Sequence, residues 1–137
     1  MKYLLDTNVC ADYLNGRHPP VVERIQACRP GDIVIGSIME AELRYGVNRS
    51  VHQRANQARL EALLANFDVV PFDSKAAVAY GRIRSALEAG GTPIGPNELF
   101  IAAQALALEL VLVTDNVAEF GRVPGLKVEN WRQPRSR

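Results

Sequence analysis

The chain has 137 residues, of which 47% are hydrophobic and 23% are charged, and its formal net charge is +1. This composition predicts one folded domain and excludes a disordered chain, while the small net charge does not by itself indicate a nucleic-acid-binding protein. No apolar run is long enough to span a membrane, and three apolar residues before Asp6 are too few for a signal peptide, so we expect a soluble cytoplasmic protein.

Short apolar runs alternate with helical patterns along the chain. Strands are predicted at residues 3–5, 33–35, 68–71 and 111–113, with an edge strand at 127–129. Helices are predicted at 9–15, 19–29, 38–46, 51–67, from Asp73 to Gly90, and at 97–108, where the pattern is apolar nearly all round. The alternation predicts an α/β fold with a parallel sheet, as one domain over residues 1–132 and a tail at 133–137.

Several residues have predicted structural roles. Ser37 and Glu40 have the spacing of a capping box at a helix start, and Asp73 is expected to cap a later helix. Cys10 and Cys28 have no CxxC spacing and fall among apolar residues of expected helices, which favours small core residues over a disulfide or a zinc site. Trp131 is expected to anchor the C-terminus.

Acidic and amide residues follow two of the expected strands. Asp6-Thr7-Asn8 ends the first strand, and Thr114-Asp115-Asn116 ends the fourth. Open α/β sheets bind their ligands at the carboxyl ends of the strands, and parallel connections bring these ends to one edge. On its own stretch, Asp6 fits a helix cap as well as it fits a functional carboxylate.

Two glutamates can join this edge. Glu42 lies early in the helix after the second strand and has no capping role, although a solvated helix charge is the commoner use of a glutamate. Glu98 opens the buried helix before the fourth strand, where it can also pair with the helix dipole. Clustered carboxylates need protons or cations, and oxygen ligands suit Mg²⁺ and Mn²⁺. These residues therefore suggest a metal-dependent phosphoryl-transfer enzyme or nuclease.

The order and spacing of these motifs resemble those of a PIN domain and, more narrowly, those of the VapC ribonuclease toxins of bacterial VapBC toxin–antitoxin modules. The resemblance runs from end to end and rests on Leu4–Asn8, Ser37–Gly46, Pro93–Glu98, Val113–Asn116 with Phe120, Val123–Leu126 and Glu129–Trp131. It implies a three-layer α/β/α fold with a parallel sheet of four to five strands. The implied activity is Mg²⁺-dependent or Mn²⁺-dependent endonucleolytic cleavage of structured RNA, with tRNA favoured, and initiator tRNA in particular. The implied partners are a VapB-type antitoxin and a second copy of the chain.

The resemblance also assigns roles to particular residues. Asp6 and Glu42 match the first two metal-binding acids of the family. Glu98 stands where the family usually has aspartate, and its longer side chain shifts the carboxylate, which can lower metal affinity or rate. Asp115 and Asn116 together match the fourth position. The residues expected to orient these groups or water are Thr7, Asn8, Ser37 and Thr114.

Two other functions remain open from the sequence. A PIN-like module that binds RNA or protein with little catalysis fits the change at Glu98. A haloacid-dehalogenase-type phosphatase would use Asp6 as nucleophile, but it wants a second acid two residues later, where this chain has Asn8. His18 and His52 have no ligand-spaced partner and are expected on the surface. The arginines that could contact phosphates, or be ordinary solvated charges, are Arg17, Arg44, Arg49, Arg54, Arg82 and Arg84.

Overall fold

The structure, a computed structural model, describes residues 1–134 and contains one parallel sheet. Its strands are β1 (Tyr3–Leu5), β2 (Ile33–Gly36), β3 (Asp68–Val70), β4 (Val111–Val113) and β5 (Val128–Glu129). Their spatial order is β3-β2-β1-β4-β5, and every neighbouring pair is parallel. The predicted parallel α/β sheet is confirmed, and β1 and β4, which carry the two acidic strand ends, are neighbours. The predicted tail at 133–137 includes residues 135–137, which lie outside the described residues.

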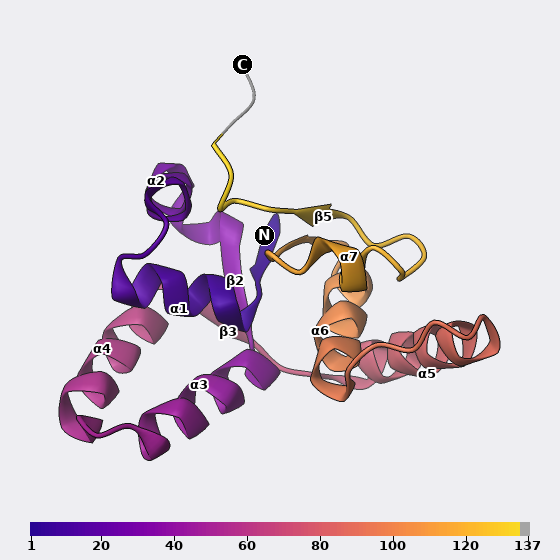
Figure 1. Cartoon of the computed structure of the whole chain (residues 1–137), viewed down its shortest axis with the longest axis horizontal. Helices are drawn as coiled ribbons and strands as arrows, with labels where there is room; N and C mark the ends of the chain where they lie inside the picture. The colour runs from indigo at the N-terminus through magenta and orange to yellow at the C-terminus, as the bar shows by residue number, and fades with distance from the viewer. Residues whose placement is uncertain (135–137) are drawn as a thin grey trace.

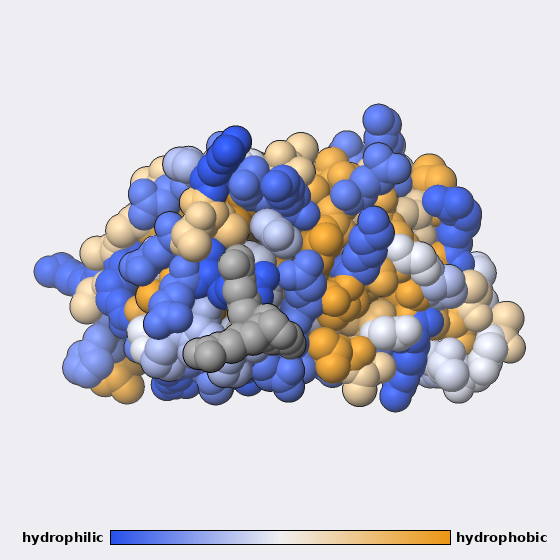
Figure 2. All heavy atoms as spheres, turned by 90° about the horizontal axis from the view of Figure 1, so that it is seen from above, coloured by the Kyte–Doolittle hydropathy of each residue, from blue (hydrophilic) through white to orange (hydrophobic). Residues whose placement is uncertain are grey.

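Helices cover both sides of the sheet. They are α1 (Thr7–Asn15), α2 (Pro19–Ala27), α3 (Ser37–Arg49), α4 (Gln53–Asn66), α5 (Ser74–Ala89), α6 (Pro96–Ala107) and α7 (Val117–Phe120), with a 3₁₀ turn at Pro30–Asp32. Figure 1 shows α1, α3 and α4 on one side of the sheet and α5 and α6 on the other, which is the expected three-layer arrangement. The face in Figure 2 is mostly hydrophilic over one half and has an apolar area over the half that holds α5 and α6.

Some local predictions were wrong. Ser37 does not cap α3: Gly36 occupies the N-cap position, and the Ser37 hydroxyl accepts a hydrogen bond from the Phe72 N–H at 3.0 Å. Glu40 is instead paired with Arg44 at 2.7 Å, one helical turn later. The helix also continues past Gly46, because a glycine weakens a helix without ending it when packing supports the turn. The expected cap at Asp73 is confirmed, since its carboxylate accepts from the Ala76 N–H at 3.1 Å.

The core lies between the sheet and its helices. β2 is buried along its whole length, and β1 and β4 are buried except for the first residue of each. Helix α6 buries Ile101, Ala102, Ala103 and Ala105, as its apolar sequence predicts. Trp131 is 1% exposed and packs edge-on against Tyr3, with ring centroids 4.9 Å apart, so it anchors the C-terminal segment. Burial raises the pKa of the Cys10 thiol, and the chain's two cysteines form no disulfide with each other. Within residues 1–134, no helix combines the length and apolarity that a membrane span requires.

Candidate active site

Asp6 lies at the carboxyl end of β1, next to the end of β4. Its backbone N–H donates to the Val113 carbonyl at 2.9 Å, and its carboxylate accepts a hydrogen bond from the Thr114 hydroxyl at 2.5 Å. Asp6 is 7% exposed and Thr114 is fully buried. The pairing of two neighbouring strands thus holds this carboxylate in one orientation.

The surroundings of Asp6 disfavour its charge. Burial raises the pKa of the Asp6 carboxyl, and the nearby Asp115 adds to this effect. The Thr114 hydroxyl and the N–H groups of Asn8 and Thr7 act in the opposite direction but do not outweigh burial. Asp6 occupies the N-cap position of α1 without a capping hydrogen bond of good geometry. A simple capping role therefore does not account for this residue, and a bound cation would relieve its desolvation.

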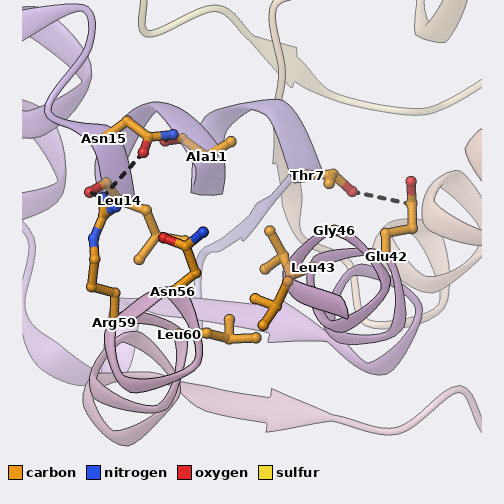
Figure 3. A pocket seen from close by; sticks show the side chains of 11 residues that line it. Thr7, Ala11, Leu14, Asn15, Glu42, Leu43, Gly46, Asn56, Arg59 and Leu60 are labelled. Carbon is orange, nitrogen blue, oxygen red and sulfur yellow. Dashed lines mark hydrogen bonds between the residues drawn. The ribbon is translucent and has the colours of Figure 1, made fainter. Parts of the chain in front are cut away.

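Glu42 lies in the second turn of α3 and faces the start of α1. Its carboxylate accepts a hydrogen bond from the Thr7 hydroxyl at 3.1 Å, and Thr7 directly follows Asp6 (Figure 3). The side chain is half-buried rather than fully solvated. The contact links the first two predicted acids through one residue, and it places Thr7 where it can orient Glu42.

Asp115 is occupied by other contacts. One carboxylate oxygen accepts from the Asn8 amide at 3.3 Å, and the other accepts from the Arg132 guanidinium at 2.9 Å. The same guanidinium makes two bonds, at 2.7 and 3.1 Å, to the buried carboxylate of Asp12 on α1. Neither Asp12 nor Arg132 was identified from the sequence. Asp115 is therefore neutralised by a cation of its own chain.

Asn116 leads to an acid that was also missed. Its N–H donates to the Thr114 hydroxyl at 3.0 Å, and its side-chain amide donates to Glu119 at 2.8 Å. Glu119 also accepts from the Gly95 N–H at 2.7 Å, and this bond and the Asn116 bond lower the pKa of its carboxyl. The sequence did offer one indication of a role for Glu119, since it lies three residues after Asn116 and directly before Phe120, which is buried. Glu119 belongs with the candidate site.

Glu98 lies beside Glu119 at the start of α6. A Cβ atom added to Gly95 would lie 2.1 Å from a carboxylate oxygen of Glu98 and 3.6 Å from one of Glu119. Both carboxylates therefore lie close to Gly95, and the missing side chain at this position makes room for Glu98. A continuous set of hydrogen bonds runs from Asp6 through Thr114, Asn116 and Glu119 to this glycine.

The acids thus lie near one edge of the sheet, but their carboxylates do not converge on one common position. Within residues 1–134, no three His, Cys, Asp or Glu side chains lie close enough together to hold a metal ion in this arrangement. In the same part of the chain, no arginine, lysine or histidine forms an ion pair with Asp6, Glu42, Glu98 or Glu119. The donors are all oxygens, and only Glu119 is influenced by a nearby arginine, Arg122, which helps to lower the pKa of its carboxyl. Oxygen donors of this kind fit a hard divalent cation.

The basic side chains divide into paired and unpaired groups. Arg44 contacts Glu40 and Glu61, and Arg84 contacts Glu88. Arg49 has no carboxylate partner among the described residues. His18 and His52 are both exposed, as expected.

A pocket of about 310 Å³ opens beside Glu42, between α1, α3 and α4. Figure 3 shows the Thr7–Glu42 contact at one end and Arg59, which donates to the Leu14 carbonyl and to Asn15, at the other. The side chains between these ends are largely apolar: Ala11, Leu14, Leu43, Val47 and Leu60. The pocket therefore joins an apolar wall to one edge of the acidic site.

Comparisons with known proteins agree with this geometry. A family model described as PIN domain matches residues 3–126. The chain is 39% identical over 132 residues to Ribonuclease VapC2 of Rickettsia felis, covering 96% of this chain and 98% of that protein. It is 36% identical over 131 residues to the tRNA(fMet)-specific endonuclease VapC of Salmonella typhimurium, again covering 96% and 98%.

Two solved structures have closely similar folds. The crystal structure of VapBC2 from Rickettsia felis bound to a DNA fragment from their promoter matches with a TM-score of 0.90 at 38% identity, covering 96% of this chain and 99% of that chain. DNA-bound VapBC from Salmonella typhimurium matches with a TM-score of 0.91 at 36% identity, covering 96% and 98%. The chain therefore belongs to the PIN-domain family and, within it, to the VapC ribonuclease toxins.

Proposed function

We propose that this VapC-family ribonuclease is a divalent-metal-dependent endonuclease that cuts tRNA. The observation that carries the proposal is a set of four acids near the carboxyl edge of the sheet, none of which forms an ion pair with another described residue: Asp6, Glu42, Glu98 and Glu119. Like charges in a partly buried site are stable only when protons or cations neutralise them. These acidic residues at the edge of the sheet therefore favour a site that binds a cation.

The metal-binding role falls on Asp6, Glu42, Glu98 and Glu119, with Asp115 and Asn116 beside them. When bound, Mg²⁺ or Mn²⁺ supplies the charge that activates water and stabilises the leaving oxygen of the phosphodiester. Thr114 and Thr7 orient Asp6 and Glu42 through their hydroxyl groups, and Asn116 orients Glu119. Asp115 remains a predicted member of the site, and its bond to Arg132 favours a positioning role for it.

The proposed substrate is tRNA, with initiator tRNA favoured. Relatives from Salmonella typhimurium and Shigella flexneri, at 36% and 37% identity, are named tRNA(fMet)-specific endonucleases. Both similarities cover 96% of this chain. Substrate choice within such a family depends on surface residues around the acids, so the tRNA is a separate question from the cleavage chemistry.

Cleavage of unfractionated tRNA by purified, antitoxin-free protein tests the proposal. Discrete fragments are expected with Mg²⁺ or Mn²⁺, and no fragments with EDTA or with Asp6→Asn. Asp68→Asn serves as the matched control, because Asp68 is exposed at the amino end of β3, away from the acidic edge. Cleavage that persists in EDTA, or in Asp6→Asn at the wild-type rate, would refute the metal-dependent mechanism. Folded protein that cleaves only after Glu98→Asp would show that this chain acts chiefly as a binding module.

A VapB-type antitoxin is the proposed protein partner. The pocket beside Glu42 offers apolar walls and a carboxylate at one end, which suits a chain segment with apolar residues and one basic side chain. An antitoxin encoded beside this gene should form a stable complex and inhibit tRNA cleavage. Leu43→Asp places a charge in the pocket and should weaken that complex, whereas Val69→Asp on β3 should not.

Self-association is the other proposed contact. Val78 on α5 is 65% exposed and lies one helical turn before Arg82, which lines a largely apolar hollow with Ala79, Ile83, Ala86 and Leu106. A second copy covering this face would remove that surface from water. Light scattering should report a dimer for the wild-type protein and a monomer for Val78→Glu.

A further inference from the structure

The chain contains two tyrosine–arginine pairs with the same spacing on two helices. On α5, the Arg84 guanidinium donates to the Tyr80 hydroxyl at 3.1 Å, and on α3 the Arg49 guanidinium donates to the Tyr45 hydroxyl at 3.2 Å. In each pair, the arginine follows the tyrosine by four residues, so both side chains lie on one helix face. The two pairs are therefore alike in local geometry and can be compared directly.

On α5, both members of the pair make contacts with other residues of the chain. Tyr80 is half-buried and stacks on Phe100, with ring centroids 4.6 Å apart. Arg84 is neutralised by Glu88 at 2.9 Å. Neither the ring nor the charge of this pair is left for an external ligand.

The pair on α3 has no such structural use. Tyr45 is 61% exposed, and its ring makes no aromatic stacking contact with another residue in the described part of the chain. Arg49 lies over that ring at 5.5 Å and has no carboxylate partner among residues 1–134. An exposed tyrosine ring with an unneutralised guanidinium held against it is a surface that can stack a base and bind a phosphate.

The position of this pair relates it to the acidic site. Tyr45 and Arg49 follow Glu42 on the same helix by three and seven residues, which places all three along one face of α3. The helix rises about 1.5 Å per residue, so Arg49 lies about 10 Å from Glu42 along the axis. That distance equals roughly three stacked nucleotides at about 3.4 Å each.

We propose that Tyr45 and Arg49 form a binding subsite for an unpaired stretch of the RNA substrate, in which Tyr45 stacks on a nucleobase and Arg49 binds a neighbouring phosphate. The inference rests on the proposed RNA-cleaving function and deepens it, because it states which part of the RNA the enzyme holds. Single-stranded loops present the unstacked bases that such a surface needs, whereas a continuous duplex does not. The subsite therefore selects looped RNA beside the acidic edge.

Binding in EDTA separates this inference from catalysis. The probe is a 5′-labelled single-stranded oligoribonucleotide followed by fluorescence anisotropy, with a duplex of the same length for comparison. Tyr45→Ala should weaken single-strand binding about tenfold, the usual effect of losing one stacked base, and Tyr45→Phe should stay within about twofold. Arg49→Ala should weaken binding and reduce its salt dependence. Arg84→Ala, from the matched pair on α5, should change neither.

Tyr45→Ala should also raise the KM for tRNA more than it lowers kcat, while its melting temperature stays close to the wild-type value because the ring is exposed. Unchanged single-strand binding in Tyr45→Ala would overturn the inference. An equal loss in Tyr45→Phe would overturn the stacking role, since the ring is retained. Normal RNA binding with weakened antitoxin inhibition would assign the surface to the protein partner instead. Failure of the proposed function is distinct from all of these, because it leaves tRNA uncut by a protein whose RNA binding still depends on Tyr45.

Discussion

Replacing Arg132 by methionine should destabilise the protein, because one guanidinium neutralises two acids from different elements. Arg132 donates to Asp12 at 2.7 and 3.1 Å and to Asp115 at 2.9 Å. The Asp12 side chain is 5% exposed, whereas those of Asp115 and Arg132 are 24% and 29% exposed. Methionine keeps most of the apolar length of arginine and removes its charge and donors. The variant would leave the buried Asp12 carboxylate without its cation.

The magnitude follows from this partial burial. Removing one partner of a fully buried ion pair costs about 3 to 5 kcal/mol, and exposed pairs contribute about 0 to 1 kcal/mol. Arg132 is partly solvated, so we expect a loss of about 2 to 3 kcal/mol in the free energy of unfolding. For a chain of this length, that loss lowers Tm by roughly 5 to 12 °C. Asp12→Asn in the Arg132→Met background should recover part of it, because the uncompensated charge is then gone.

Thermal and urea unfolding followed by far-UV circular dichroism measures these changes. Arg54→Met is the matched control, because Arg54 is exposed on α4 and makes no hydrogen bond or ion pair with other described residues. It should leave Tm within about 2 °C of the wild-type value. An Arg132→Met protein that unfolds like the wild type would refute the reasoning. The reasoning would also be refuted if the stability losses from Asp12→Asn and Arg132→Met simply added in the double variant, because substitutions at two interacting residues should have non-additive effects on stability.

Three further changes test the site and its surroundings. Asp6→Asn should abolish cleavage and yet stabilise the metal-free protein at neutral pH. Burial raises the pKa of Asp6 in the folded state above its ordinary value of 3.8, so the ionised carboxylate destabilises the fold increasingly as the pH rises above 3.8. Thermal melts in EDTA should therefore show the stability gained by Asp6→Asn fading as the pH falls to 3.8 and below. Gly95→Ala should lower the tRNA cleavage rate at least tenfold while changing the free energy of unfolding by less than about 1 kcal/mol, because the new methyl group would displace only the flexible Glu98 carboxylate. Cleavage at the wild-type rate would show that the position of Glu98 is unimportant. Cys10 should resist iodoacetamide in the native protein and react after unfolding, because burial raises the pKa of its thiol, and mass spectrometry of the labelled peptides would reveal an exception.

Features with a local physical cause were predictable from the sequence. Short apolar runs marked the three central strands, β1, β2 and β4, since a strand buried on both faces has little room for polar residues. Asp6 and Asp115 were placed at strand ends for the same reason, and Asp73 was identified as a cap because its side chain acts three residues away. The acidic edge follows from parallel strand direction, which depends on the alternation of elements along the chain.

Only the tertiary structure determined the partners of polar side chains that contact residues far away in the sequence. Ser37 fits a capping box locally, but its hydroxyl accepts from Phe72, 35 residues away. Arg132 and Asp12 are separated by 120 residues, and no periodic pattern connects them. The contact of Arg132 with Asp115 depends on where the C-terminal segment packs, and Glu119 lies beside the candidate site because α7 brings it within hydrogen-bonding distance of the Gly95 N–H. Hydrophobic periodicity reports burial along one element, whereas hydrogen bonds and ion pairs depend on how distant elements pack, and this information is absent from local sequence.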